Sequence, residues 1–184
     1  MKNVLLILTD GFEEIEAIGT FAILKRSNIN VDIFALRNSK INGRYGLEIN
    51  YPIFNKDSDL SKYDLLFIAG GPEYQELEAS SVFQTVIKYF YDNKKYIAAI
   101  CAGPTLLGHL GYLKGLNYTC FKSMNEDFKG NYLDKYVVKD QNIITAVSAS
   151  ATIDFAFEIV KTLTNEDYAL KVKDSIYYNF KDNN

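Results

Sequence analysis

The 184-residue chain contains little of several residue types on which common classes of protein depend. Its two cysteines cannot build a disulfide framework, so we expect reduced thiols and a cytoplasmic protein. A single histidine excludes most histidine-based zinc sites, and we expect no metal. With only three prolines and no repeat or linker, the chain has no sign of a domain boundary, so we expect one domain over residues 1–184.

Long apolar runs and clustered positive charge are also missing. The longest apolar runs, 4–8 and 97–100, are far shorter than a membrane span, and the first residues lack the cleavage site of a signal peptide. The net charge is −3, and the 20 basic residues are scattered along the chain. We therefore expect neither a membrane nor a nucleic acid as a partner.

An alternation of strand and helix patterns runs along the chain. Hydrophobic residues make up 48% of it and charged residues 23%, which are ordinary globular values. The patterns predict strands at 3–9, 30–36, 63–71 and 95–100, further short strands at 116–121, 135–140 and 142–148, and a hairpin excursion at 41–54. They predict helices at 12–27, 80–93, 103–113 and 152–163. This order predicts an α/β fold, a doubly wound and mainly parallel sheet sandwiched between helices.

Three loops follow the expected central strands at their carboxyl ends. They carry Asp10-Gly11, Gly70-Gly71 and Cys101-Ala102-Gly103. In open α/β sheets ligands bind at the carboxyl ends of the strands, so the three loops are expected to converge on one site.

The stretch "AAICAGPTLL" (98–107) surrounds Cys101 with small residues where a strand meets a helix. A nucleophile on a sharp strand-to-helix turn requires small neighbours, and a helix N-terminus favours a thiolate. A cysteine at such a junction is equally often a small buried hydrophobe. The local pattern leaves both interpretations open.

Glu16 lies on the expected first helix, on one face with Phe12, Gly19 and Ile23 by helical spacing. An acid on a core-facing stripe needs a partner or a raised pKa, so Glu16 is either a protonatable acid beside Cys101 or a rim residue that reaches water. The preceding residues 13 and 14, also glutamates, are interpreted as first-turn charges that the helix dipole favours.

Two further features have weaker signals. Gly70-Gly71-Pro72 either ends a strand or brings backbone N–H groups close to a carbonyl or anionic ligand. His109 lies about 12 Å along the expected helix from its start, too far to serve Cys101 as a base, so we expect a packing or surface role. An amidotransferase-like hydrolase, which needs a histidine base, is the weakest of the functions considered.

The segments "DGFEEIEAI", "IAGGP" and "AAICAGPTLLG" together resemble the DJ-1/ThiJ/PfpI superfamily, in particular its DJ-1-like subgroup, over about residues 2–170. The resemblance implies a flavodoxin-like fold with a nucleophile elbow, usually in a homodimer. It implies that Cys101 is a reactive, redox-sensitive nucleophile and that Glu16 is the protonated carboxyl bonded to its sulfur. The N–H groups of Gly71 and Ala102, beside Gly70, would form the oxyanion pocket.

The same resemblance implies the function. The leading hypothesis is cofactor-free glyoxalase or deglycase action on small α-oxoaldehydes, which converts methylglyoxal to lactate through a Cys101 hemithioacetal with Glu16 as proton shuttle. The alternative is a non-catalytic oxidative-stress sensor or chaperone in which Cys101 oxidises to the sulfinate.

The chain departs from the family pattern at three places. Phe121 stands where many relatives have a histidine, with Cys120 before it as either a second redox centre or a strand-filling residue. Residues 146–150 replace the usual S-R-G-P-G segment. Ala102 stands where protease-like members have a histidine, so a peptidase is not expected.

Overall fold

A six-stranded sheet forms the centre of the fold in the computed structural model, which describes residues 1–178. The last six residues of the expected 1–184 domain lie outside the described residues. The sheet order is β2-β1-β5-β6-β10-β9, parallel throughout except for β9, which runs antiparallel to β10. The strands are β1 (Asn3–Leu8), β2 (Asn30–Ala35), β5 (Leu65–Ile68), β6 (Tyr96–Ile100), β9 (Val137–Asp140) and β10 (Ile143–Ala146). The mainly parallel, doubly wound sheet is confirmed.

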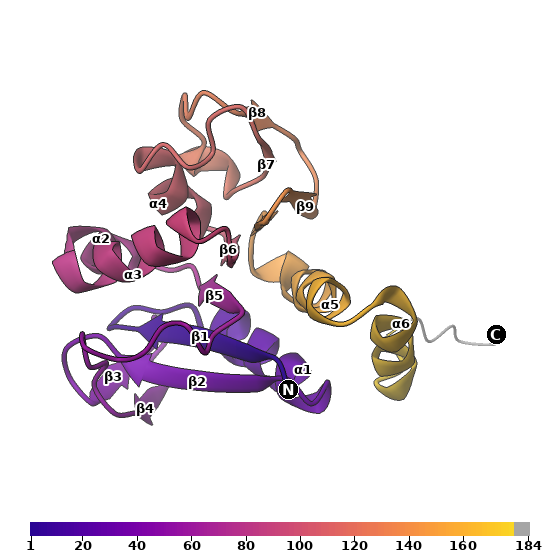
Figure 1. The fold of residues 1–184 in the computed structure, drawn as a ribbon, viewed down its shortest axis with the longest axis horizontal. Coiled ribbons are helices and arrows are strands. Elements are labelled where there is room, and N and C mark those ends of the chain that lie inside the picture. The colour runs from indigo at the N-terminus through magenta and orange to yellow at the C-terminus, as the bar shows by residue number, and fades with distance from the viewer. Residues whose placement is uncertain (179–184) are drawn as a thin grey trace.

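Helices cover both faces of this sheet (Figure 1). They are α1 (Thr20–Arg26), α2 (Tyr74–Ala79), α3 (Ser81–Asp92), α4 (Gly103–His109), α5 (Thr152–Leu163) and α6 (Glu166–Ser175), with a π-helical turn η1 (Ile15–Gly19) and 3-10 turns η2 (Lys122–Met124) and η3 (Ala149–Ala151). Two small ladders lie outside the sheet: β3 (Lys40–Asn42) with β4 (Glu48–Asn50), and β7 (Asn117–Tyr118) with β8 (Asn131–Tyr132). In the described part of the chain, no helix has the length and apolar character that crossing a bilayer demands.

The alternation along β1 divides the core into two layers. Val4, Leu6 and Leu8 pack in the cluster that includes α1 and α5, whereas Leu5 and Ile7 pack in the cluster with α3 and α4. Side chains alternate across a strand, and a sheet buried on both faces therefore needs a continuous apolar run. The expected helix 152–163 matches α5, and 80–93 matches α3 to within a residue at each end.

Three expected elements differ from the structure, and two helices had not been expected. The helix expected at 103–113 ends at His109, because Gly111 (φ +77°) takes a left-handed conformation that a helix cannot continue. The strand expected at 116–121 shrinks to β7, which pairs with β8 and not with the central sheet. Helices α2 and α6 were not expected, and the helix expected from residue 12 begins only at Ile15, with a π-helical turn.

Candidate active site

Cys101 occupies a sharp turn between β6 and α4. Its φ of +62° lies in the left-handed region, which costs a non-glycine residue conformational energy. Two hydrogen bonds hold the turn: its N–H donates to Ala146 O (2.9 Å), and its carbonyl accepts from Phe121 N (2.9 Å). A methyl group at Gly103 would come within 3.0 Å of Ile68 O, so the position two residues later must be small. This is the geometry of a nucleophile elbow.

The Glu16 carboxyl is fully buried beside this turn, so its interpretation as a rim residue is wrong. One oxygen, Oε2, accepts a hydrogen bond from Gly70 N (2.8 Å), and both this oxygen and Cys101 Cβ lie against Gly70, so the carboxyl is close to the Cys101 side chain. The other oxygen has no nitrogen or oxygen partner among residues 1–178. The π-helical turn η1 places Glu16 here, and the Glu13 carboxylate accepts its N–H (2.9 Å). Such turns are frequent at functional sites.

Burial controls the ionisation of both groups. It raises the pKa of Glu16 to about 7, although the contact with Cys101 lowers it. Burial, and after it the negative charge of Glu16, raises the pKa of the Cys101 thiol above its usual range. The Ala102 N–H lowers that pKa, as expected at a helix start, but burial outweighs it. Near pH 7 the thiol therefore keeps its proton, while Glu16 exchanges between acid and carboxylate.

The paired glycines are required by close packing. A methyl group at Gly70 would collide with the Glu16 carboxylate and lie 2.6 Å from Cys101 Cβ. Gly71 has a φ of +96°, and a methyl group there would collide with Gly11 O. Among residues 1–178 the Gly71 N–H has no hydrogen-bond acceptor. The geometry favours close approach to a ligand over a simple strand end.

A cleft of about 250 Å³ opens at Cys101. The other residues that line it are Arg44, Gly71, Pro72, Tyr74, Gln75, Ala102, Phe121 and Met124, of which the sequence had already indicated Gly71, Pro72, Ala102 and Phe121. The Arg44 charge, carried by the β3–β4 hairpin, lowers the pKa of Glu16. In the sequence Arg44 belongs to "NGRYG", a stretch typical of a turn. Nothing in that local pattern predicts that Arg44 approaches Cys101.

Two acidic residues have roles that were not expected. Glu73 is buried, accepts a hydrogen bond from Thr9 N (2.8 Å), and has a pKa well above its usual value because of that burial. Because Glu73 directly follows Gly70-Gly71-Pro72, its position in the sequence could have indicated that it lies near the site. Glu14 does not merely complement a helix dipole: its carboxylate accepts from Tyr45 N (2.7 Å) and anchors the hairpin that carries Arg44.

The comparisons with known proteins agree with this geometry. The model of the DJ-1/PfpI family matches residues 2–162. The chain belongs to the DJ-1/PfpI family.

Two curated relatives illustrate the range within the DJ-1/PfpI family. An uncharacterized protein of Staphylococcus epidermidis, SERP1413, is 31% identical over 168 residues, which cover 88% of this chain and 98% of the relative. Deglycase TK1284 of Thermococcus kodakarensis is 29% identical over 166 residues, with 88% of this chain and 99% of the relative covered.

Solved DJ-1 structures have the same fold. A cysteine-to-alanine mutant of the DJ-1 superfamily protein STM1931 from Salmonella typhimurium superimposes with a TM-score of 0.90 at 27% identity, over 96% of this chain and 98% of the other. Drosophila melanogaster DJ-1beta gives a TM-score of 0.87 at 28% identity, over 95% and 97%. These neighbours support the flavodoxin-like assignment of the sheet.

Cys120 lies outside the cleft of this DJ-1/PfpI fold. It is fully buried, it follows β7 and does not lie within it, and its thiol faces Asn125 Oδ1 at 3.9 Å. Burial raises the pKa of Cys120 to about 11, as it raises that of Cys101, but the fully buried Cys120 sulfur is also closed to reagents. Its packing in the core does not favour a second redox centre.

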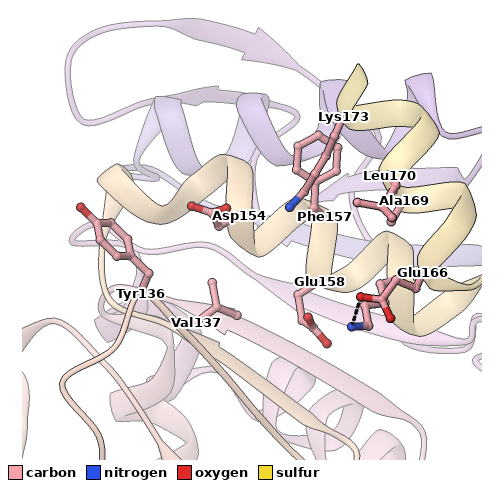
Figure 2. A pocket seen from close by; sticks show the side chains of 10 residues that line it. Tyr136, Val137, Asp154, Phe157, Glu158, Glu166, Ala169, Leu170 and Lys173 are labelled. Atoms are coloured by element: carbon pink, nitrogen blue, oxygen red, sulfur yellow. Dashed lines mark hydrogen bonds and ion pairs between the residues drawn. The ribbon is translucent and has the colours of Figure 1, made fainter. Parts of the chain in front are cut away.

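A larger hollow lies away from Cys101, between α5, α6 and the start of β9 (Figure 2). It measures about 320 Å³. Lys161 pairs with Glu166 across it (3.0 Å), and the Lys173 ammonium lies 5.1 Å above the Phe157 ring. None of its lining residues is a cysteine, serine or histidine, so it has no nucleophile of the kind found at the β6–α4 turn.

Proposed function

We propose that this DJ-1/PfpI protein is a cofactor-free enzyme that converts small α-oxoaldehydes, such as methylglyoxal, to α-hydroxy acids. One observation supports this most directly: Cys101 lines a cleft, and behind it lies the buried Glu16 carboxyl, which interacts with the thiol and has a pKa of about 7. A group with that pKa both takes and gives protons at neutral pH, as isomerisation of an α-oxoaldehyde requires. The relative named a deglycase supports a small-carbonyl substrate.

In the proposed reaction the Cys101 sulfur adds to the aldehyde carbon, and the thiol proton passes to the aldehyde oxygen to give a hemithioacetal. The Glu16 carboxylate removes the proton from that carbon and returns it to the neighbouring ketone carbon, while the hydroxyl proton of the hemithioacetal passes to the ketone oxygen. The first carbon is thereby oxidised to a thioester and the second reduced to an alcohol, so no external oxidant or reductant is needed. Water then hydrolyses the thioester, which releases lactate and regenerates the thiol.

The N–H groups of Gly71 and Ala102 are proposed to stabilise the oxygen anions that form on these carbons. In support, the Gly71 N–H is unpaired within residues 1–178, and Gly70, Gly71 and Ala102 all lie at the Cys101 turn. The small cleft accommodates a three-carbon aldehyde.

Lactate formation from methylglyoxal tests the proposal. Wild type and Cys120→Ser should form lactate at equal rates, whereas Cys101→Ser and Glu16→Gln should lose at least about a hundredfold, the usual contribution of a nucleophile or acid–base group. A wild type without detectable lactate at micromolar protein and millimolar aldehyde would overturn it.

A second candidate function is oxidation sensing, with the sulfinate of Cys101 as its end point. The observation that favours it is the difference between the thiols: Cys101 opens to the cleft, while Cys120 is fully buried. Mass spectrometry after graded peroxide should then find Cys101 oxidised well before Cys120. Equal rates would refute this function without affecting the first.

We also propose a cytoplasmic homodimer of single-domain chains. In support, Ile15 on η1 and Ile153 on α5 expose 59% and 40% of their surface, and η1 and α5 contact each other, so a second copy would cover apolar side chains on both elements. Light scattering should give twice the monomer mass, and Ile15→Glu with Ile153→Glu should halve it. A wild-type monomer would contradict this.

A further inference from the structure

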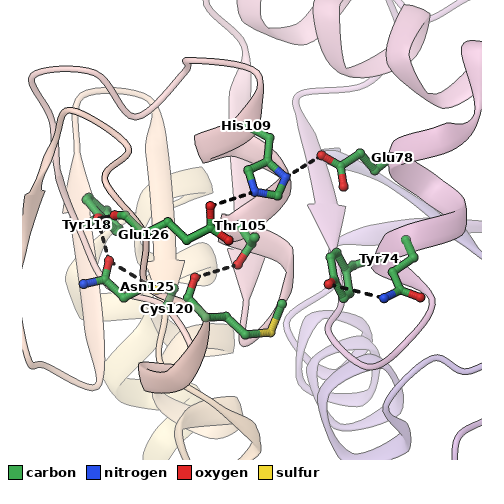
Figure 3. A network of polar contacts seen from close by, with 10 residues as sticks. Tyr74, Glu78, Thr105, His109, Tyr118, Cys120, Asn125 and Glu126 are labelled. Carbon is green, nitrogen blue, oxygen red and sulfur yellow. Dashed lines mark hydrogen bonds and ion pairs between the residues drawn. The ribbon is translucent and has the colours of Figure 1, made fainter.

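Helix α4 ends at a histidine that contacts two carboxylates from different parts of the chain (Figure 3). His109 Nδ1 lies 2.5 Å from Glu78 Oε1 on α2. His109 Nε2 lies 3.4 Å from Glu126 Oε2, which follows the η2 segment. The imidazole thus stands between two elements that the sequence separates widely.

Each of those two segments contributes a wall to the cleft at Cys101. Tyr74 and Gln75, at the start of α2, line one wall, and Glu78 lies one helical turn further along α2. Phe121 and Met124 line the other wall, next to the position of Glu126. His109 therefore connects the two segments that carry these walls, through Glu78 on one and Glu126 on the other.

The hydrogen bonds require a particular charge state. Carboxylates only accept hydrogen bonds, so both ring nitrogens of His109 must donate for both contacts to form. A neutral imidazole has a single N–H and can satisfy only one of them. The arrangement in Figure 3 is that of the imidazolium cation.

We propose that His109 is a positioning residue, which in its doubly protonated form holds the two walls of the Cys101 cleft together. When the ring loses a proton, the longer contact is lost first, because Glu126 is also the more exposed partner. The η2 segment and the residues after it then depend on weaker links to the rest of the fold, such as Thr105 Oγ1 to Met124 O (3.4 Å), the Tyr118 hydroxyl to Asn125 Oδ1 (2.7 Å) and the exposed Lys122–Asp134 pair (3.2 Å). The cleft becomes easier to enter.

The surroundings set the pH at which this happens. Burial lowers the pKa of His109, but Glu78 from α2 and Glu126 from the segment after η2 outweigh it, so the net shift is upward. The uncharged Phe128 ring also lies edge-on to the imidazole, with the ring centres 5.7 Å apart. The ring therefore titrates above its usual pKa near 6.5, and the closed form prevails on the acidic side.

The proposal depends on the site of the proposed function but not on its chemistry, so we test access to Cys101 without any aldehyde. In a Cys120→Ser background, the alkylation rates with a bulky aryl maleimide and with iodoacetamide are measured between pH 6 and 9. Their ratio cancels most of the thiol and Glu16 ionisation, because both reagents require the same thiolate.

We expect this ratio to rise about two- to fivefold with pH in wild type, since partly exposed ion pairs are weak. In His109→Gln and in Glu126→Gln the ratio of the two alkylation rates should be high and nearly independent of pH. The control variant Glu166→Gln, on α6 and far along the chain from the cleft, should give the wild-type ratio. Circular dichroism verifies that each variant is folded. If wild type, His109→Gln and Glu126→Gln gave the same ratio at every pH, the proposal would be overturned, whether or not lactate forms.

Discussion

The Glu16 carboxyl and the Cys101 side chain meet at Gly70 and influence each other's pKa, although they come from the turn after β1 and the turn after β6. Burial raises the pKa of both, and Gly70 N holds the carboxylate in place. The contact couples the charge of each group to that of the other, and it makes the stability and the reactivity of the protein depend on pH.

Glu16→Gln should make stability less dependent on pH. The pKa of Glu16 is about 7 in the folded chain and about 4.5 when unfolded, so the native state binds the extra proton and loses stability as pH rises between those values. The loss amounts to about 3 kcal/mol across the window. Urea unfolding at pH 5 and pH 8 should show that decline in wild type and a decline smaller by that amount in the variant. Identical declines would mean that Glu16 ionises normally.

The same variant should make Cys101 more reactive towards alkylation while abolishing lactate formation. Ionised Glu16 raises the pKa of the thiol, and the neutral amide removes that charge. At pH 8.5, with Cys120→Ser as background, iodoacetamide should react several-fold faster than with wild type. Slower alkylation would show that the carboxyl activates the thiol directly and would contradict the assigned electrostatics.

Gly70→Ala should disturb the site more than its small size suggests. The added methyl group collides with the Glu16 carboxylate and Cys101 Cβ, and overpacking of this kind costs about 1–3 kcal/mol. Gly46→Ala is the matched control: its φ of +96° strains the backbone, but no atom lies within 4 Å. Both should lower the melting temperature, and only Gly70→Ala should change the Cys101 alkylation rate. Unchanged alkylation in Gly70→Ala would contradict the packing.

Phe121→His should accelerate hydrolysis of the thioester. The Phe121 N–H donates to Cys101 O, and its side chain lines the cleft, so an imidazole there would stand close to the sulfur and could activate water. Lactate release should rise at least several-fold, and Phe121→Leu should leave it unchanged. Equal rates in all three proteins would mean that hydrolysis does not limit turnover.

Much of this protein follows from local sequence. The buried apolar runs indicate β1, β5 and β6, because a strand covered on both faces must be apolar throughout. The small residues around Cys101 indicate the elbow, because the left-handed turn leaves no room for larger ones. Both features depend on neighbours in the chain.

Other features depended on residues far apart in sequence. Helical spacing placed Glu16 on a core-facing stripe, yet only the packing of η1 against Gly70 and Cys101 decided that it is buried and lies beside a thiol. Arg44 reaches the cleft because Glu14 anchors its hairpin. Periodicity indicates which face of an element points inwards, but the partner on that face, and hence the pKa of a buried acid, is set by long-range contacts that only the tertiary structure determines.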